Sequence, residues 1–322
     1  MTALGARART AMLDAIARAL TGRGIEAAER EVVARDLTYS GFRKAGRALL
    51  VRRLARAALA GGGMTILAPA LGGKFVLACG GEDFGVGWEV LEHGTYEPHL
   101  ASFYERTLRP GMTVVDVGAN IGFHALHAAV LVGPGGRVIA IEPDPDNAAL
   151  LRASLSHNPG LRVDLLEIAL SDADGELILT DLGNAGNSGA RFTHPDRATL
   201  DALVHGPRPS FRSVPARRFD LLHADLPVDL VKLDVEGFEP RVVRGMERML
   251  ARCRPIVVSE YAPSNLRALG GTQPEEYLAW FHAHGYAARI LDGDAPPRPA
   301  EASALARALG AAHHVDLVFV PA

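Results

Sequence analysis

Residues 113–123 read Thr-Val-Val-Asp-Val-Gly-Ala-Asn-Ile-Gly-Phe. The β-branched run at the start predicts a strand, and the glycines after it predict a tight turn. Helix-forming residues follow over 122–132, and a second apolar strand is predicted over 137–142. This order is typical of the start of a nucleotide-binding α/β unit, here with carboxylates near both strand ends, Asp116 and Glu142.

The spacing of the glycines distinguishes between two kinds of nucleotide cofactor. The NAD fingerprint Gly-x-Gly-x-x-Gly would place Asn120 and Phe123 at two of its three glycine positions. The pattern acidic-x-Gly-x-Gly-x-Gly, used for S-adenosylmethionine, is matched at Asp116, Gly118 and Gly122. Its exception is Asn120, and Asn tolerates a left-handed backbone better than most residues. A generic turn without a ligand is the alternative.

The charge of the cofactor agrees with the second pattern. NAD brings a pyrophosphate, which favours a helix N-terminus and bare amides. S-adenosylmethionine brings an ammonium and a sulfonium, so we expect the carboxylate of Asp116 to face positive charge. Glu142 is expected to accept hydrogen bonds from the two ribose hydroxyls.

The composition limits the class of protein. The chain has 322 residues, enough for one large domain with an extension or for two domains. Its net charge of −3 gives no general attraction to nucleic acid, so no DNA partner is expected. Two cysteines, Cys79 and Cys253, favour a reducing compartment over a disulfide scaffold. No run of 18 apolar residues and no apolar leader is found, so we expect a cytoplasmic protein.

Residues 1–63 are predicted to form a helical N-terminal extension that ends at the glycines of positions 61–63. Within it, residues 43–56 carry six basic side chains and no acidic one. This stretch is either a basic amphipathic helix that meets an anionic surface, or a helix docked on the main domain with a solvated basic face. The second interpretation is the simpler one. The extension could also mediate homo-oligomerisation.

Residues 64–322 are predicted to form one α/β domain, a Rossmann-like, mostly parallel seven-stranded sheet with helices on both faces. The predicted strands are 113–117, 137–142, 161–168, 228–234, 254–260, 286–291 and 313–320, and the main helices are 122–132, 144–157, 239–251 and 273–284. The last strand is expected to be antiparallel, at an edge of the sheet.

The remaining segments break this alternation. Before it, β-rich runs over 64–67 and 74–79 precede a turn-rich stretch at 82–89, and a helix is predicted from Pro98. Added strands are expected at 175–180 and 213–219. The segment 183–210, which begins with a glycine- and asparagine-rich loop, is interpreted either as a lid or substrate wall, or as disorder.

A second charged stretch, 228–239, runs from a predicted strand into a helix. Strand alternation would place Lys232, Asp234 and Glu236 on one side of the chain. Such charges are costly to bury unless they pair or bind a ligand, and ligands of open α/β sheets lie at this end of the strands. A salt-bridged strand end is the alternative. Glu260 ends the next strand, at the same rim.

Five blocks taken together resemble the FkbM family of S-adenosylmethionine-dependent methyltransferases. They are Asp-Val-Gly-Ala-Asn-Ile-Gly from position 116, Val-Ile-Ala-Ile-Glu-Pro-Asp-Pro from 138, Ala-Leu-Ser-Asp-Ala-Asp-Gly from 169, Gly-Asn-Ser-Gly from 186 and Lys-Leu-Asp-Val-Glu-Gly-Phe-Glu from 232. Their order and spacing match from about Tyr96 to Glu260. The chain departs from the family pattern at Ser154 and at the run Arg-Phe-Asp-Leu of 218–221, which bears on the identity of the acceptor.

The resemblance implies a class I methyltransferase fold and, mainly, O-methylation of a small-molecule or glycan acceptor. By matching position it implies cofactor contacts from Asp116, Gly118, Ala119, Asn120, Gly122, Glu142, Pro143, Ala169, Leu170 and Asp234, with Tyr96 and Glu97 as a pair that caps the cofactor. Asp234 is the first candidate for the base that removes a proton from the acceptor hydroxyl, with Glu236 and His124 as further candidates. Lys232 would keep Asp234 ionised. Mg²⁺, if one takes part, would be bound by Asp234, Glu236 and Glu260.

Other functions remain open at this point. An N-methyltransferase or an RNA methyltransferase of the same fold would share these motifs, although an RNA enzyme should show a basic face across its catalytic domain. A non-catalytic, methyltransferase-like binding protein would keep the fold and lose the pocket charges. A nicotinamide-dependent oxidoreductase would need the phosphate-binding glycines that are absent here.

Overall fold

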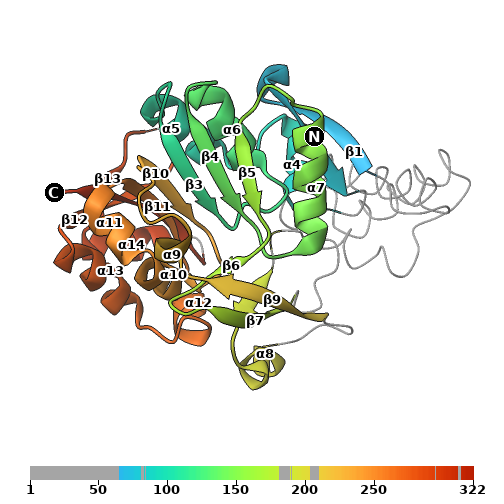
Figure 1. Cartoon of the computed structure of the whole chain (residues 1–322). Helices are drawn as coiled ribbons and strands as arrows, with labels where there is room; N and C mark the ends of the chain where they lie inside the picture. Colours follow the sequence, from blue (N-terminus) through green and yellow to red (C-terminus); the bar gives the residue numbers. More distant parts are fainter. Residues whose placement is uncertain are drawn as a thin grey trace, which may run out of the picture. The chain divides into compact units, whose positions relative to one another are not determined.

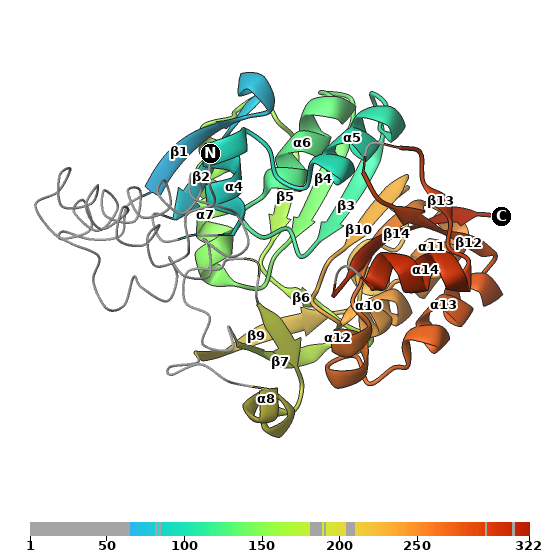
Figure 2. The same ribbon diagram turned by 180° about the vertical axis from the view of Figure 1, so that it is seen from behind.

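A computed structural model of the chain describes residues 65–80, 83, 85–180, 189, 191–203, 210–293, 295–310 and 313–322 (Figures 1 and 2). The predicted helical extension, its glycine boundary, the basic stretch 43–56 and most of the Gly/Asn loop lie outside the described residues. Leu67–Cys79 and Asp83–Ala322 form one compact unit, and the account below concerns that unit.

The main sheet has the strand order β13-β12-β14-β11-β10-β3-β4-β5. Its strands are β3 (Thr113–Val117), β4 (Arg137–Ile141), β5 (Val163–Leu166), β10 (Leu230–Leu233), β11 (Ile256–Tyr261), β12 (Tyr286–Leu291), β13 (Arg298–Pro299) and β14 (Val315–Pro321). From β5 to β11 all neighbours are parallel, as predicted. The described sheet has eight strands and not seven, because the two-residue strand β13 is too short to show a periodic pattern.

The position of β14 corrects one prediction. This strand is antiparallel, as expected, but it lies between β11 and β12 and is not an edge strand. Its central residues Leu317, Val318 and Phe319 are almost fully buried, because strands on both sides and side chains on both faces cover them.

Helices cover both faces of the sheet, as predicted (Figure 1). Val114, Val138 and Leu230 pack with α5 (Pro98–Thr107), α6 (Phe123–Val132) and α7 (Pro145–Ser156). Their neighbours Val115 and Ile139 point the other way, toward a core cluster that includes α10 (Glu239–Gly245), α11 (Glu247–Cys253), α13 (Pro274–Ala283) and α14 (Ala302–Leu309). Strands buried on both faces explain why their sequences are continuous apolar runs.

The helix predicted over 239–251 is in fact two helices, α10 and α11, that meet at Met246. Gly245 lies so close to the neighbouring loop that a Cβ there would be 1.9 Å from the carbonyl oxygen of Ser171. The break therefore comes at a close backbone contact that helix periodicity does not reveal.

A second, four-stranded sheet has the order β6-β9-β7-β8. Its strands are β6 (Ala169–Leu170), β7 (Gly175–Thr180), β8 (Phe192–His194) and β9 (Phe211–Arg217), and α8 (Arg197–Leu203) follows β8. The added strands expected at 175–180 and 213–219 are confirmed as β7 and β9. Part of the segment predicted as wall or disorder is thus regular structure.

A small layer built from β1 (Thr65–Ala70), η2 (Leu71–Gly73), β2 (Phe75–Gly80) and α4 (Val86–His93) packs against the first turn of α6. The sequence predicts turns over 82–89, but α4 begins within that stretch. Asp83 accepts hydrogen bonds from the backbone N–H groups of Gly85 and Gly87, both at 3.0 Å, and so organises the start of the helix. Gly87 is required there because a Cβ would lie 2.8 Å from Cys79 Cβ.

Two short helices complete the described elements, α9 (Phe219–Leu222) and α12 (Pro263–Ala268). Among the helices of the described residues, none has the length and apolar character needed to cross a membrane.

Candidate active site

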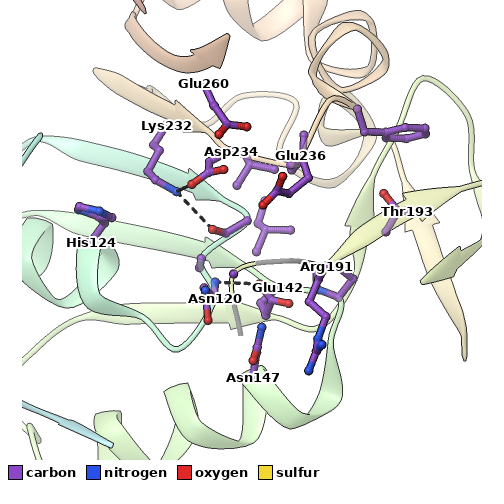
Figure 3. A pocket seen from close by; sticks show the side chains of 18 of the residues that line it. Asn120, His124, Glu142, Asn147, Arg191, Thr193, Lys232, Asp234, Glu236 and Glu260 are labelled. Atoms are coloured by element: carbon purple, nitrogen blue, oxygen red, sulfur yellow. Dashed lines mark hydrogen bonds and ion pairs between the residues drawn. The ribbon is translucent and has the colours of Figure 1, made fainter. Parts of the chain in front are cut away.

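A cavity opens at the carboxyl ends of β3, β4, β10 and β11, where the sequence placed its charged residues (Figure 3). It has about 1140 Å³ of empty space, part of which is open solvent. The predicted site residues that line it are Tyr96, Glu97, Gly118, Ala119, Asn120, His124, Glu142, Pro143, Ala169, Leu170, Lys232, Asp234, Glu236 and Glu260.

The glycine turn after β3 forms the floor of the cavity. Gly118 and Gly122 have φ of +76° and +95°, and Asn120 has φ of +52°. A Cβ on Gly118 would lie 1.8 Å from the carbonyl oxygen of Asp234, and one on Gly122 would lie 2.1 Å from Leu151 Cδ1. The left-handed backbone expected at Asn120 is confirmed, and its Oδ1 accepts a hydrogen bond from the N–H of Ile121 at 2.6 Å.

Glu142, at the end of β4, is buried and held by the same turn. Its Oε2 accepts a hydrogen bond from Asn120 N at 2.8 Å, and its Oε1 accepts one from Asp144 N at 2.9 Å. Burial raises the pKa of Glu142 to about 7 despite these two N–H donors, which favour the ionised form. The Asn147 side chain is a third donor to this carboxylate, so one of its four lone pairs remains to accept a hydrogen bond from a ligand hydroxyl.

Lys232 joins two carboxylates beneath and beside the cavity. Its Nζ lies 3.4 Å from Asp116 Oδ1 and 3.2 Å from Asp234 Oδ2, and it donates to the carbonyl oxygen of Gly118 at 3.3 Å. Burial alone would lower the pKa of Lys232, but the two carboxylates outweigh burial and hold it well above its usual value. The strand end is thus both salt-bridged and part of the cavity wall.

Two residues of the predicted cofactor set, Asp116 and Gly122, do not line the cavity. Asp116 is 1% exposed and lies behind Lys232, so in this structure its carboxylate faces an ammonium of the protein itself. Gly122 acts through packing, because it allows α6 to start against Leu151.

Glu97 and His124 form a pair at the side of the cavity. His124 Nε2 lies 2.8 Å from Glu97 Oε2, and the Tyr96 ring lies 5.7 Å from the His124 ring. Burial raises the pKa of the Glu97 carboxyl, but the hydrogen bond and charge of His124 outweigh it and lower the pKa to about 2. Like Asn120, Glu97 has a left-handed backbone, with φ of +44°.

Glu236 reaches the cavity by a turn and not by strand alternation, because β10 ends at Leu233. The Glu236 backbone is left-handed, with φ of +58°. Glu239 Oε1 accepts hydrogen bonds from Val235 N at 3.0 Å and from Gly237 N at 3.2 Å, which fixes the turn on both sides of Glu236. Burial, followed by the nearby carboxylates of Asp234 and Glu239, raises the pKa of Glu236 to about 8.

Glu260 ends β11 on the same rim. Its Oε1 lies 3.7 Å from His314 Nδ1, and its buried Oε2 has no hydrogen-bond partner among the described residues. Burial, with the charge of Asp234 next in effect, raises the pKa of Glu260 well above its usual value. Within the described part of the chain, no three His, Cys, Asp or Glu side chains are arranged to hold a metal ion, so the Mg²⁺ ligands remain a prediction without structural support.

Several residues around the site are not singled out by sequence reasoning. Asn147, Arg191, Thr193 and His314 line the cavity, while Glu239 and Asn265 support the Glu236 turn. Arg191 donates from Nε to Asp144 Oδ2 at 2.5 Å and so ties the second sheet to the end of β4. Gly189, Arg191 and Thr193 belong to the segment 183–210, and the prediction that this segment forms a substrate wall is the sequence feature that points to them.

The departures from the family pattern lie away from the cavity. Ser154 Oγ accepts a hydrogen bond from Ala78 N at 2.8 Å and so joins α7 to β2. Asp220 accepts from Arg248 N and Met249 N at 2.8 and 2.9 Å, at the first turn of α11. Neither run lines the cavity, so these contacts are structural, and their bearing on acceptor identity finds no support here.

Comparison with known proteins connects this geometry to a family. The chain is 32% identical over 207 residues to the 31-O-demethyl-FK506 methyltransferase FkbM of Streptomyces tacrolimicus, a match that covers 56% of this chain and 74% of that protein. It is 29% identical over 167 residues to the 2-O-methyltransferase NoeI of Sinorhizobium fredii, covering 49% of this chain and 66% of that protein. A solved structure of a methyltransferase FkbM from Methylobacillus flagellatus is similar with a TM-score of 0.39 and 15% identity, over 68% of this chain and 50% of that one.

The family model for the methyltransferase FkbM domain matches residues 116–288. That range begins at the carboxylate of β3, includes the glycine turn, Glu142 and the Lys232–Glu239 stretch, and takes in more than half of the chain. The α/β fold with its large, mostly parallel mixed sheet is accordingly class I methyltransferase-like. The chain belongs to the FkbM family of S-adenosylmethionine-dependent methyltransferases.

Proposed function

We propose that this enzyme methylates a hydroxyl group of a sugar, glycolipid or other natural-product acceptor. The names of two relatives support this assignment, since one is named a 31-O-demethyl-FK506 methyltransferase and the other a 2-O-methyltransferase. The structural observation that supports it most is the position of Asp234. Its carboxylate is partly exposed on the cavity wall and lies 3.2 Å from the buried ammonium of Lys232.

The described residues fit S-adenosylmethionine as the methyl donor. A side chain at Gly118 would collide with the carbonyl of Asp234, so the bare glycine keeps the floor of the cavity open and close to β10. Glu142 would take the ribose hydroxyls, and Tyr96 with Glu97 would close the side of the site. The carboxyl groups of Glu97, Asp234, Glu236 and Glu260 line the cavity, and a positively charged ligand would favour their ionised forms.

The donor supplies a methyl group that is already activated by its positively charged sulfur. The enzyme's residues then have two tasks, to align the acceptor hydroxyl and to accept its proton. Asp234 accepts the proton as the acceptor oxygen bonds to the methyl carbon and the carbon–sulfur bond breaks. Alignment can contribute about 7–11 kcal/mol at best, and a general base about 10²–10⁴-fold in rate.

Lys232, 3.2 Å away, holds Asp234 in position between turnovers. Asp234 is a better candidate for the base than His124, because the Nε2 atom of His124 is already engaged by Glu97. It is also better placed than Glu236, because burial raises the pKa of Glu236 to about 8 and its carboxyl holds a proton near neutral pH as long as no cation is bound.

The test uses purified enzyme, S-adenosylmethionine labelled in its methyl group, and fractions of sugars, glycolipids and hydroxylated natural products. We expect label to enter an acceptor as a methyl ether, identified by mass spectrometry. The variant Asp234→Asn should still bind S-adenosylmethionine and should transfer methyl groups at least about 100-fold more slowly at saturating donor. Transfer at the wild-type rate by this variant would refute the base assignment, and label found only on nitrogen would refute O-methylation.

A further inference from the structure

Lys232 is already paired with two carboxylates. Its Nζ lies 3.4 Å from Asp116 Oδ1 and 3.2 Å from Asp234 Oδ2, and it donates a hydrogen bond to the Gly118 carbonyl at 3.3 Å. It forms no ion pair with a third carboxylate among the described residues. The remaining acidic residues therefore depend on other partners.

Most of those carboxylates have such partners among the described residues. Glu97 is paired with His124 at 2.8 Å, Glu142 accepts two backbone N–H groups, and Glu260 lies 3.7 Å from His314. Glu236 differs from Glu97 and Glu260, which face histidine rings, and from Glu142, which has two close backbone N–H donors. The partner that the structure gives its carboxylate is the neutral side-chain amide of Asn265, at 3.4 Å from Nδ2 to Oε2, and it forms no ion pair with a described residue.

The backbone holds Glu236 in place at an energetic cost. A left-handed conformation is unfavourable for a non-glycine residue, and such residues persist where the surrounding structure imposes them. Here the imposing contacts are the two hydrogen bonds to Glu239 and the packing of Gly237 on Asn265, where a Cβ would lie 2.5 Å from the Asn265 backbone. The result is a carboxylate fixed at the cavity beside Asp234 and Glu260 (Figure 3).

We propose that Glu236 is a contact residue for the positively charged sulfur of the methyl donor. This goes beyond the assignment of Glu236 as an alternative base, and it rests on the donor that the family uses and not on the proposed acceptor. A strained turn holds the Glu236 carboxylate in the cavity, and no cationic side chain of the described residues pairs with it. The sulfonium of the bound donor would supply the missing positive charge.

Methyl transfer removes this charge. The donor's sulfonium becomes the neutral thioether of S-adenosylhomocysteine, while the ammonium, ribose and adenine of the molecule are unchanged. A carboxylate that contacts the sulfur therefore favours the donor over the product, whereas one that contacts the ammonium favours both equally. The contact would help the product leave after each turnover.

The experiment is calorimetric titration of the full-length protein with S-adenosylmethionine and, separately, with S-adenosylhomocysteine. Glu236→Gln keeps the shape of the side chain and removes its charge. We expect it to weaken S-adenosylmethionine binding about tenfold, equal to about 1.4 kcal/mol, and to leave S-adenosylhomocysteine affinity unchanged. Unchanged S-adenosylhomocysteine affinity also shows that the site is folded.

Glu275→Gln is the matched control, since Glu275 is an exposed carboxylate on α13 outside the cavity, and both affinities should remain those of the wild type. Glu236→Asp, which keeps the charge and tolerates a left-handed backbone, should retain the preference for S-adenosylmethionine. Equal weakening of both ligands by Glu236→Gln, or no change in either, would overturn the proposal. If the wild-type protein bound neither ligand, the assignment of S-adenosylmethionine as its methyl donor would be wrong, independently of the acceptor.

Discussion

The backbone N–H of Asn120 donates a hydrogen bond to the buried carboxylate of Glu142 at 2.8 Å. The glycine turn after β3 and the acidic end of β4 are therefore one structural unit, in which the left-handed backbone of Asn120 points its N–H at Glu142. Two sequence features that look independent, 22 positions apart, depend on one dihedral angle.

Replacing Asn120 tests that dependence. Asn120→Gly keeps the backbone angle and loses only the hydrogen bond to Ile121 N, so it should change the free energy of unfolding by about 1 kcal/mol or less. Asn120→Val should cost about 1–2 kcal/mol more, because a β-branched residue resists a left-handed backbone. Urea denaturation measures both, and equal stability of the two variants would contradict the argument.

Gly118→Ala should abolish S-adenosylmethionine binding. The added Cβ would lie 1.8 Å from the carbonyl oxygen of Asp234, so β3 and β10 must separate at the cavity floor. Gly133→Ala is a suitable control, since Gly133 also has positive φ, at +64°, but a Cβ added there would meet no neighbouring segment within 4 Å. Calorimetric titration with S-adenosylmethionine checks the pair, and normal binding by Gly118→Ala would show that the turn can move.

Lys232→Met should destabilise the protein by about 3–5 kcal/mol, because it leaves Asp116 buried without a counter-charge. The double variant Asp116→Asn with Lys232→Met should recover a large part of that loss, because it removes both buried charges. Denaturation of the two single variants and the double variant gives the coupling energy. Strict additivity would mean that the pair at 3.4 Å contributes nothing.

Stability should fall as the pH rises toward neutral, in part because of Glu239. Burial raises the pKa of Glu239 to about 7 in the folded protein, above its ordinary value of 4.5. A group of this kind stabilises the fold fully below pH 4.5, and the contribution is lost as the pH rises through about 7. Glu239→Gln keeps an oxygen for the N–H groups of Val235 and Gly237 and cannot ionise.

The unfolding free energy of the wild type, measured between about pH 5 and pH 8, should therefore decline with a larger slope than that of Glu239→Gln. One group contributes at most about 1.4 kcal/mol per pH unit. Glu142 and Glu236 add to the wild-type slope in the same direction, because burial raises their pKa values to about 7 and 8. Identical slopes would show that Glu239 does not titrate in this range.

The central sheet and the rim of the site can be predicted because their signals are local. The predicted bounds of β3 are the observed ones, Thr113–Val117, since a β-branched run next to a glycine turn contains its own start and end. The cavity position of Glu142, Asp234 and Glu260 follows from one rule, that the carboxyl ends of parallel strands share an edge.

Other features cannot be predicted, because they depend on contacts between distant segments. Asp116 has the sequence position of a ligand-facing acid, yet the structure pairs it with Lys232, which belongs to another strand far along the chain. The role of Glu239 requires knowledge that β10 ends at Leu233 and that the next residues turn back over its carboxylate. The helix α4 is not predicted because Gly85 and Gly87 are typical of a loop. The structure shows that Asp83 accepts hydrogen bonds from their backbone N–H groups at the start of the helix.

The insertion of β14 between β11 and β12 has a consequence for the order of folding. β12 is synthesised before β14 but joins the parallel strands only through it, by the pairing of Ala288 with Phe319 and of Phe319 with Val257. A nascent chain that has not yet reached residue 315 leaves the open edges of β11 and β12 both unpaired, and open edges are templates for aggregation. We therefore expect this half of the sheet to form after the parallel half, because β12 pairs with it only once β14 is in place.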